Sequence, residues 1–434
     1  MKRALRYAAL VFVFMLPFGT KKFIFALIPQ MYEYVREFSS FLLYATDILA
    51  LILIALAFMY VRRRVLRTPL VKWYGVLGAL ACASLFFALN FAYSLYVAMG
   101  FILALLISLA VIAAMQEGAV NIRDIFKALA ASATLQAVIA IAQFYYQKSV
   151  GLWILGESVI TATTPGVARV DIGGVSFLRA YGTLPHANIL AGFLVMGLIA
   201  CAYLYLTAPR RHPIMHAGSA MAFFAILSAL VFTFSRSGWI VASFAIFTIG
   251  IYATWNKELR ASAKEFIAVT LISLVALSLV LGSAVVSRAG FAKGEFSVDH
   301  RIYYNEMGLT LIAQHPLGVG IGNEVLQAAQ EGLFAAKGLT RVWLWQPVHN
   351  IYILIASELG IAGLAVFLLM AFAVFRRISF TSSDAVFVGL LVTSLLLFGF
   401  VDHFPWDLHA GRLMFWTAFG IMGAVTLKPS SSNG

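Results

Sequence analysis

The chain has 434 residues, of which 62% are hydrophobic and only 11% are charged, and its formal net charge is +13. An ordinary soluble domain contains about 45–50% apolar and about 25% charged residues. This composition excludes a soluble globular enzyme, a disordered chain and a disulfide scaffold. It predicts an all-α polytopic membrane protein.

Long apolar runs define the predicted elements in chain order. Because backbone groups in lipid must be hydrogen-bonded within their own segment, a membrane-spanning helix needs about 20 mostly apolar residues. Such runs predict about twelve transmembrane helices in a single transmembrane domain over residues 1–434, and no cleavage site follows the first. The runs cover 5–20, 40–61, 70–89, 92–115, 124–146, 187–208, 214–233, 238–255, 265–287, 349–375, 384–401 and 411–427.

Basic residues orient these predicted helices. Lys and Arg gather at alternate ends of the runs, as they do when they stay on the cytoplasmic side. This predicts cytoplasmic N- and C-termini, and it explains the positive charge without a nucleic-acid partner. The cytoplasmic ends hold Lys2, Arg3, Arg6, Arg62, Arg63, Arg64, Arg67, Arg210, Arg211, Lys257, Arg260, Lys264, Arg376, Arg377 and Lys428, and the outer ends hold Lys21, Lys22, Arg36, Arg236 and Arg412.

Two long connections fall on the outer side. They cover residues 147–186 and 288–348, and the second is expected to be partly helical. Connections longer than about 12–15 residues are usually functional or disordered. The aromatic, glycine and charged residues in both favour loops that fold over the outer face.

Neither a metal site nor a nucleotide site is expected, and no cofactor is predicted. Ligand spacings typical of zinc and calcium sites do not occur, and neither does the glycine-rich nucleotide loop. His403 and His409 flank a short outer loop with Asp402 and Asp407. This loop could form a site, but a polar loop at the membrane surface is the favoured interpretation.

The outer face collects arginines. Arg236 lies in the sequence Phe234-Ser235-Arg236-Ser237-Gly238, between two apolar runs, and Arg301 follows Asp299 and His300. An arginine against apolar helices either reaches toward water or binds an anion. The guanidinium fork matches phosphate oxygens and stays charged, so a phosphate clamp is the functional interpretation.

Two further polar segments lie at the outer face. Residues 315–323 read His-Pro-Leu-Gly-Val-Gly-Ile-Gly-Asn, and such spacing allows a tight turn that approaches another group closely. The first outer loop ends between Arg179 and Asn188. His186 and Asn188 could cap the following helix or contact neighbouring loops, while Arg179 and Arg169 could add charge near an anionic headgroup.

The most specific feature opens the tenth run, at Pro347-Val348-His349-Asn350. His349 is predicted at a helix N-terminus, where the helix dipole disfavours imidazolium and favours the neutral imidazole that a general base needs. Glu358 is an ionisable group in an otherwise apolar run, so it is expected to have a partner and to face the bundle interior.

Together these residues suggest a reaction at the outer surface. Arginines can hold a diphosphate that links a sugar to a lipid. When the diphosphate leaves, guanidinium groups can stabilise its charge without a metal. His349 can deprotonate the attacking hydroxyl. A histidine base without a carboxylate nucleophile indicates a single displacement, which inverts the anomeric carbon.

The pattern His349-Asn350, nine residues, Gly360, two residues, Gly363 resembles the signature of the O-antigen ligase (WaaL-type) family. This family lies within the Wzy-like, GT-C-like membrane glycosyltransferases. The sequence around Arg236, the arginine at 301 and the run 315–323 are also similar to family landmarks, and the similarity is strongest from about 220 to 365.

The resemblance implies a GT-C-like, metal-independent, inverting glycosyltransferase of the bacterial inner membrane. It would transfer O-antigen polysaccharide from undecaprenyl diphosphate to the lipid A-core. His349 would be the base, and Arg236 and Arg301 would contact the diphosphate. Asn350 and Arg169 are further candidates for substrate binding.

Weaker candidates come from a segment similar to the family pattern Gly-Thr-x-x-His-x-Asn. These are Arg179, His186 and Asn188, and Ala187 stands where the family usually has proline.

Three alternatives stay open. O-antigen polymerases share the topology but often carry an arginine followed eleven positions later by glycine, a spacing that none of the outer-loop arginines shows. Protein O-oligosaccharyltransferases share the histidine signature and differ in the acceptor. A lipid-linked sugar transporter would want midspan charges, for which only Asp47 and Glu358 are clear candidates.

Overall fold

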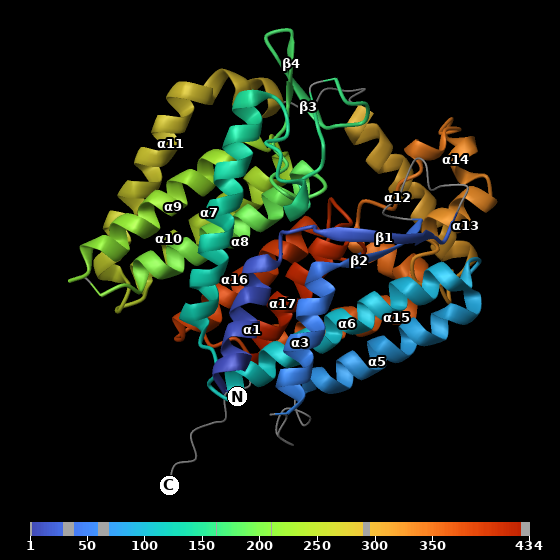
Figure 1. Cartoon of the computed structure of the whole chain (residues 1–434), viewed down its shortest axis with the longest axis horizontal. Helices are drawn as coiled ribbons and strands as arrows, with labels where there is room; N and C mark the ends of the chain where they lie inside the picture. Colours follow the sequence, from blue (N-terminus) through green and yellow to red (C-terminus); the bar gives the residue numbers. More distant parts are fainter. Residues whose placement is uncertain are drawn as a thin grey trace. The chain divides into compact units, whose positions relative to one another are not determined.

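The computed structural model describes residues 2–28, 39–59, 69–161, 163–209, 211–289 and 296–426. These residues are mostly helical and include two two-stranded hairpins (Figure 1). They form two compact units, and each is described by itself. Unit 1 comprises Met1–Thr20, Gly118–Phe291 and Ser379–Phe398, and unit 2 comprises Lys21–Glu117, Ala292–Ile378 and Gly399–Gly434. Seven of the basic residues that orient the predicted helices, Arg36, Arg62, Arg63, Arg64, Arg67, Arg210 and Lys428, lie outside the described residues.

A multi-pass membrane protein is confirmed by the length and apolarity of the helices. Within the described ranges, eight helices qualify as membrane spans: Leu70–Phe87, Phe91–Gln116, Ile122–Tyr146, Ala187–Leu206, Pro213–Phe232, Arg236–Trp255, Arg260–Gly282 and Ile351–Phe375. Each of the twelve predicted runs contains a helix, but α1 (Lys2–Met15) and α3 (Ala45–Phe58) have 14 residues each. At about 1.5 Å per residue they are shorter than the roughly 30 Å of bilayer hydrocarbon. Twelve crossings therefore stay a prediction.

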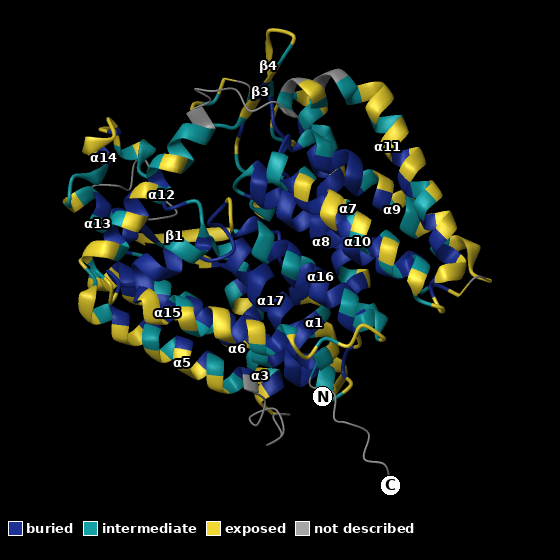
Figure 2. Ribbon diagram, turned by 180° about the vertical axis from the view of Figure 1, so that it is seen from behind, coloured by how far each residue is buried: buried dark blue, intermediate teal, exposed yellow. Residues whose placement is uncertain are grey.

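Unit 1 is organised around α8 (Ala187–Leu206), an apolar helix without a charged residue. Its residues are all buried, and Figure 2 shows the helix in dark blue. Burial is complete because several helices pack against α8, chiefly α7 (Ile122–Tyr146), α9 (Pro213–Phe232), α10 (Arg236–Trp255) and α16 (Ser383–Phe398). α1 packs on α7, and α11 (Arg260–Ala289) packs on α10 with much of its surface exposed.

A β-hairpin projects from unit 1 within residues 147–186. Its strands β3 (Arg169–Ile172) and β4 (Val175–Leu178) pair antiparallel, with Ile172 opposite Val175. Gly173 and Gly174 form the turn, at φ of 58° and 83°. Because a two-residue hairpin turn often needs positive φ at both positions, this glycine pair permits the tight connection.

Unit 2 is organised around α6 (Phe91–Gln116) and α17 (His409–Thr426), which pack along each other. Gly420 allows the close approach, since a Cβ there would meet the backbone of Ser108. α3 also packs on α6, and α5 (Pro69–Ser84) packs on α15 (Ile351–Phe375). The strands β1 (Lys21–Ala26) and β2 (Ser40–Tyr44) form an antiparallel hairpin before α3.

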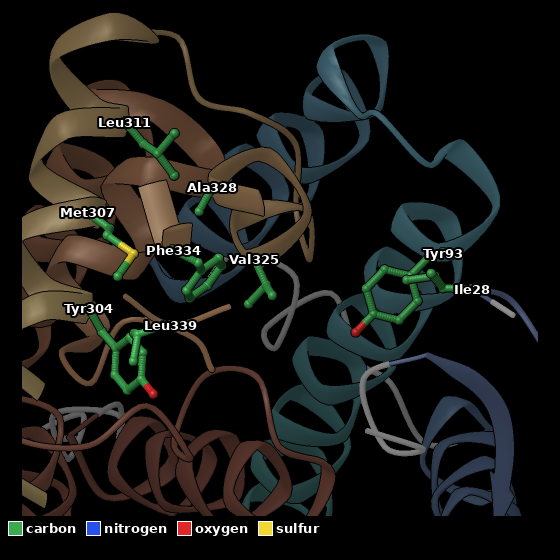
Figure 3. Packing of buried hydrophobic residues seen from close by; sticks show 9 residues of the cluster. All are labelled: Ile28, Tyr93, Tyr304, Met307, Leu311, Val325, Ala328, Phe334 and Leu339. Carbon is green, nitrogen blue, oxygen red and sulfur yellow. The ribbon is translucent and has the colours of Figure 1, made fainter. Parts of the chain in front are cut away.

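Residues 288–348 contain three helices that build their own apolar cluster in unit 2. They are α12 (Phe296–Gln314), α13 (Glu324–Gln330) and α14 (Leu333–Ala336). Met307 and Leu311 of α12 pack with Ala328 of α13 and Phe334 of α14, and Tyr304 continues the cluster along α12 (Figure 3). This packing fixes the helix that carries Arg301. Short 3-10 turns lie at Leu85–Phe87, Trp153–Leu155 and Val342–Leu344.

α15 is kinked at Gly360, whose φ of 74° and ψ of 175° are not helical. The backbone hydrogen bonds at the kink are made with residues 316–322. The amide of Val319 donates to the carbonyl of Ser357 at 2.8 Å, and the amide of Ile361 donates to the carbonyl of Pro316 at 3.1 Å. The kink therefore does not leave these backbone groups unpaired.

The glycine run at 318–322 approaches another group closely, which the sequence allowed beside an ordinary loop turn, and that group is α15. Gly318 has φ of 92°, and a Cβ there would meet the backbone of Glu358 and Gly360. In return, a Cβ on Gly360 would meet the backbone of Leu317. Glycine is needed at both positions for its φ and for its size.

Replacing Gly360 with Ala should destabilise the protein by more than about 1 kcal/mol, because alanine at positive φ is strained and its methyl group would displace the 316–322 segment. The measurement is the thermal-unfolding midpoint in detergent. Gly75→Ala is the matched control, since Gly75 lies in helix α5 of the same unit with nothing within 4 Å of a Cβ there. An equal midpoint for both variants would contradict the role of the kink.

Candidate functional site

The turn between α9 and α10 positions Arg236 in unit 1. Phe234 is buried in this turn with φ of 48°, which is unusual for a residue other than glycine. The Ser235 hydroxyl accepts a hydrogen bond from the amide of Gly238 at 3.2 Å and so caps α10. Arg236 therefore occupies the first position of the helix, where the helix dipole also favours an anion.

Arg179 contacts the same turn. Its side chain is buried, its Nε donates to the carbonyl of Thr233 at 2.6 Å, and its Nη2 donates to Oδ1 of Asn188 at 2.8 Å. Asn188 is itself buried in the first turn of α8. Both of these acceptors are neutral, and they orient the guanidinium.

Two buried glutamines of α7 hold the segment that carries Arg179. Oε1 of Gln143 accepts from the amides of Tyr181 and Gly182, at 3.0 and 2.8 Å. Oε1 of Gln136 accepts from the amide of Thr183 at 2.9 Å. Sequence reasoning missed both, although amides seven residues apart on one face of an apolar helix are a detectable signal.

Arg288, in the last turn of α11, is a third arginine at this turn, and sequence analysis did not select it. Its Nε lies 3.5 Å from the carbonyl oxygen of Phe234. The carbonyls of Thr233 and Phe234 therefore each face a guanidinium, one from Arg179 and one from Arg288. Arg179, Arg236 and Arg288 are far apart in the sequence and meet at this turn only in the folded chain. Their sequence separation therefore could not predict this group of three arginines.

An apolar groove of about 940 Å³ leads to this turn in unit 1. Helices α9, α10 and α11, which lie side by side in Figure 1, line it from Trp239 to Thr254 on α10 and from Phe266 to Val286 on α11. Arg236 precedes Trp239 by one helical turn and Arg288 follows Val286 by two residues, so both arginines lie at the same end of the groove. The groove thus combines apolar walls with a cationic end.

His186 and Arg169 take different positions from Arg179 and Asn188. His186 is the N-cap of α8, and its Nδ1 accepts from the amide of Asn188 at 3.1 Å, which confirms the capping interpretation. Arg169 is exposed on β3, and its guanidinium donates to the carbonyl of Thr164 at 2.9 Å.

In unit 2, His349 lies directly before α15 with a defined hydrogen bond. Its Nδ1 is 2.9 Å from the carbonyl oxygen of Pro347. Because a carbonyl oxygen only accepts, Nδ1 carries a proton and Nε2 is the basic nitrogen of the neutral ring. The Tyr304 ring stacks on the imidazole at 5.4 Å between ring centroids. Burial and the positive charges of His403 and Arg301 lower the pKa of His349, which favours the neutral base.

Arg301 belongs to the same site, three residues before Tyr304 on α12. It is close enough to His349 to disfavour the imidazolium form. Its guanidinium makes no hydrogen bond or ion pair with the part of the chain that the structure describes. Arg301 is thus a cation beside His349 with donors available for a substrate anion.

Asn350 and Glu358 tie α15 to neighbouring segments of unit 2. Oδ1 of Asn350 caps α15 by accepting from the amides of Tyr352 and Ile353, and its Nδ2 donates to the carbonyl of Phe400 at 3.2 Å. Glu358 is buried, and its two oxygens accept from the amide of Gly322 and from Nε1 of Trp406, both at 2.9 Å. A buried and partnered Glu358 confirms the expectation from the sequence.

A small cavity of about 60 Å³ lies behind Pro347 and is lined by ionisable groups of unit 2. They are Glu324, Glu358, Asp407, His409 and Arg412. Burial, reinforced by Glu358, raises the pKa of Glu324 to about 8, although the amide of Val348 donates to this carboxyl group. Throughout the described ranges, no three His, Cys, Asp or Glu side chains are arranged to hold a metal ion.

The predicted residues therefore form two groups. Arg179, Asn188 and Arg236 converge on the α9–α10 turn of unit 1, with His186 at the start of α8. His349, Arg301 and Asn350 lie together in unit 2.

The fold defines a multi-pass helical membrane protein with cationic side chains and a neutral imidazole in the segments that follow α9 and precede α15. A family model described as O-antigen ligase matches residues 220–368, which include Arg236, Arg301 and His349. The match agrees with the resemblance seen in the sequence and supports an O-antigen ligase family assignment and an enzyme of glycosyltransferase type. A comparison with curated proteins found no match.

Replacing Glu324 with Gln should remove a pH dependence of stability. The folded protein retains a proton on Glu324 up to about pH 8, whereas the unfolded chain releases it near its ordinary pKa of 4.5. Linkage then makes the free energy of unfolding of the wild type fall as pH rises across this window. The thermal-unfolding midpoint of Glu324→Gln should move above that of the wild type between pH 5 and about pH 8, and a constant difference between them would contradict this assignment.

Proposed function

We propose that the chain is an O-antigen ligase of the bacterial inner membrane. It transfers polysaccharide from undecaprenyl diphosphate to a hydroxyl of the lipid A-core, on the periplasmic face, by an inverting and metal-independent reaction. His349 is the general base. Arg236 and Arg301 bind the diphosphate, with Arg179 as a further cation. Residues 1–434 form a single transmembrane domain with periplasmic loops at 147–186 and 288–348.

The contact between Nδ1 of His349 and the Pro347 carbonyl is the observation that carries this proposal. The Pro347 carbonyl holds the proton on Nδ1, and the surroundings disfavour a second proton. Nε2 is therefore available to take a proton from a hydroxyl group. Stacking on Tyr304 restricts rotation of the ring, so the base is oriented before a substrate arrives.

The groove of unit 1 supports a lipid diphosphate as donor. A polyprenyl chain is apolar along its length, and its diphosphate lies at one end. The groove offers apolar walls over α10 and α11, and Arg236 and Arg288 lie at its end. An apolar surface of this kind binds lipid by burial, and guanidinium groups recognise the phosphate oxygens.

The proposed step is balanced without an added co-reactant. The acceptor hydroxyl oxygen forms a bond to the anomeric carbon while the bond from that carbon to the diphosphate oxygen breaks. The hydroxyl proton passes to Nε2 of His349, and the bonding electron pair leaves with the diphosphate. Arginine side chains stabilise the charge that develops on the leaving group.

Replacing His349 with Ala should abolish ligation. In a strain that lacks this chain, the wild-type chain should restore the long-chain lipopolysaccharide ladder on a gel, whereas His349→Ala should leave lipid-linked polymer to accumulate. His212→Ala is the control, because His212 is exposed and its side chain makes no capping hydrogen bond. Loss of the polymer itself would indicate a polymerase, and a normal ladder with His349→Ala would refute the base.

Replacing Gly250 with Leu should weaken use of long-chain donors. Gly250 lines the groove, and a Cβ added to it would have no atom within 4 Å. A leucine side chain would therefore fill part of the groove that the lipid chain would occupy. The KM for an undecaprenyl donor should rise about tenfold, since losing two methylene contacts costs roughly 1.6 kcal/mol. A short-chain donor should be much less affected. Gly218→Leu, at an open α9 position outside the groove, is the control, and an equal rise in both variants would contradict the assignment.

A further inference from the structure

The segment 399–408, which leads into α17, is fastened to the start of α15 in unit 2. The amide of Ile351 donates to the carbonyl of Gly399 at 2.8 Å, and Nδ2 of Asn350 donates to the carbonyl of Phe400 at 3.2 Å. Farther along the segment, Nε1 of Trp406 donates to Glu358. These bonds hold His403, which lies between them in sequence, beside His349.

The His403 ring meets the His349 ring directly. Their centroids are 4.7 Å apart and their planes are inclined by 77°, so the edge of one ring faces the other. His403 is 7% exposed, and its Nδ1 lies 2.8 Å from both carboxylate oxygens of Asp407. Because a carboxylate accepts, Nδ1 of His403 carries a proton.

The balance of charge differs between the two rings. His403 faces the carboxyl groups of Asp402, Asp407 and, from α13, Glu324. His349 faces Arg301 and Tyr304 of α12 and also Asp402, whose raising effect on the pKa of His349 is outweighed by burial, His403 and Arg301. Burial alone lowers the pKa of His403, but Asp407 and Asp402 more than offset it and raise this pKa. The remaining ionisable groups near this segment, Glu358 of α15 and His409 and Arg412 of α17, line the cavity with Asp407. Of the two rings in contact, His403 therefore carries the positive charge and His349 stays neutral.

We propose that His403, fixed by Asp407, is a positioning residue whose positive charge keeps His349 in its neutral, proton-accepting form. Two imidazolium rings in edge-to-face contact would repel each other, so a charged His403 excludes a proton from Nε2 of His349. The enzyme would then keep its base ready when the surroundings become mildly acidic. This inference rests on the proposed role of His349 as base.

The test compares His403→Gln, which removes the charge, with His403→Lys, which keeps it, in the full-length protein in detergent. The first readout is the pH at which transfer falls on the acid side. The second is the pH dependence of carbethoxylation of His349 by diethyl pyrocarbonate, followed by mass spectrometry, which tracks the neutral imidazole without requiring turnover.

In His403→Gln, both curves should move to higher pH by about one unit or more, whereas His403→Lys should keep the wild-type curves. A lower rate in His403→Gln at every pH, with unchanged curves, would show a merely structural role and overturn the proposal. If His403→Gln does not fold, an upward shift in His403→Lys would overturn it and wild-type curves would support it. Failure of the proposed function can be distinguished from failure of this inference. An active His349→Ala variant would show that His349 is not the base. The carbethoxylation curves report the charge of His349 whether or not it is the base.

Discussion

A polar group buried among apolar helices is tolerated when a hydrogen-bond partner lies at a defined position, and both units depend on this constraint. In unit 1, Gln143 accepts from two consecutive amides and holds the chain that carries Arg179. In unit 2, both oxygens of Glu358 accept hydrogen bonds from segments distant in sequence. The same buried contacts that remove the cost of burial also determine where the candidate site residues lie.

The helices were predictable because an apolar run of about 20 residues has few alternatives in a membrane. The place of His349 at a helix start was predictable too, since the local sequence contains both the histidine and the helix cap Asn350. Arg288 was not, because its place at the α9–α10 turn depends on how α11 packs. The β3–β4 hairpin was also missed, although Gly173 and Gly174 form a recognisable turn signal.

His403 shows a different reason for a missed residue. Its sequence neighbours suggested a polar surface loop, and the chemistry comes from contacts with His349 and Asp407 that only folding creates. The sequence of a short polar loop between apolar runs does not indicate which of its side chains is buried. Here the orientation of the loop is fixed by the hydrogen bonds of Asn350 and Trp406, and no spacing pattern in the sequence predicts these bonds.

The family signature can be explained residue by residue in physical terms. His349 supplies the imidazole, Asn350 ends the loop and starts the helix, and Gly360 allows the backbone to bend where residues 316–322 enter. The ten residues between His349 and Gly360 thus consist of the cap Asn350 and one helical segment, 351–359. The imidazole lies before one end of this segment and the kink lies at the other.

The kink at Gly360 also divides α15 mechanically. Before the kink, carbonyls that would continue the helix are bonded to residues 319 and 320, so the first nine residues of α15 are joined to the α12–α13 connection. After the kink, Phe367 packs against Phe415 of α17 and also contacts the ring of Tyr352 from the segment before the kink. The position of the imidazole at the start of α15 therefore depends on where the α12–α13 connection lies.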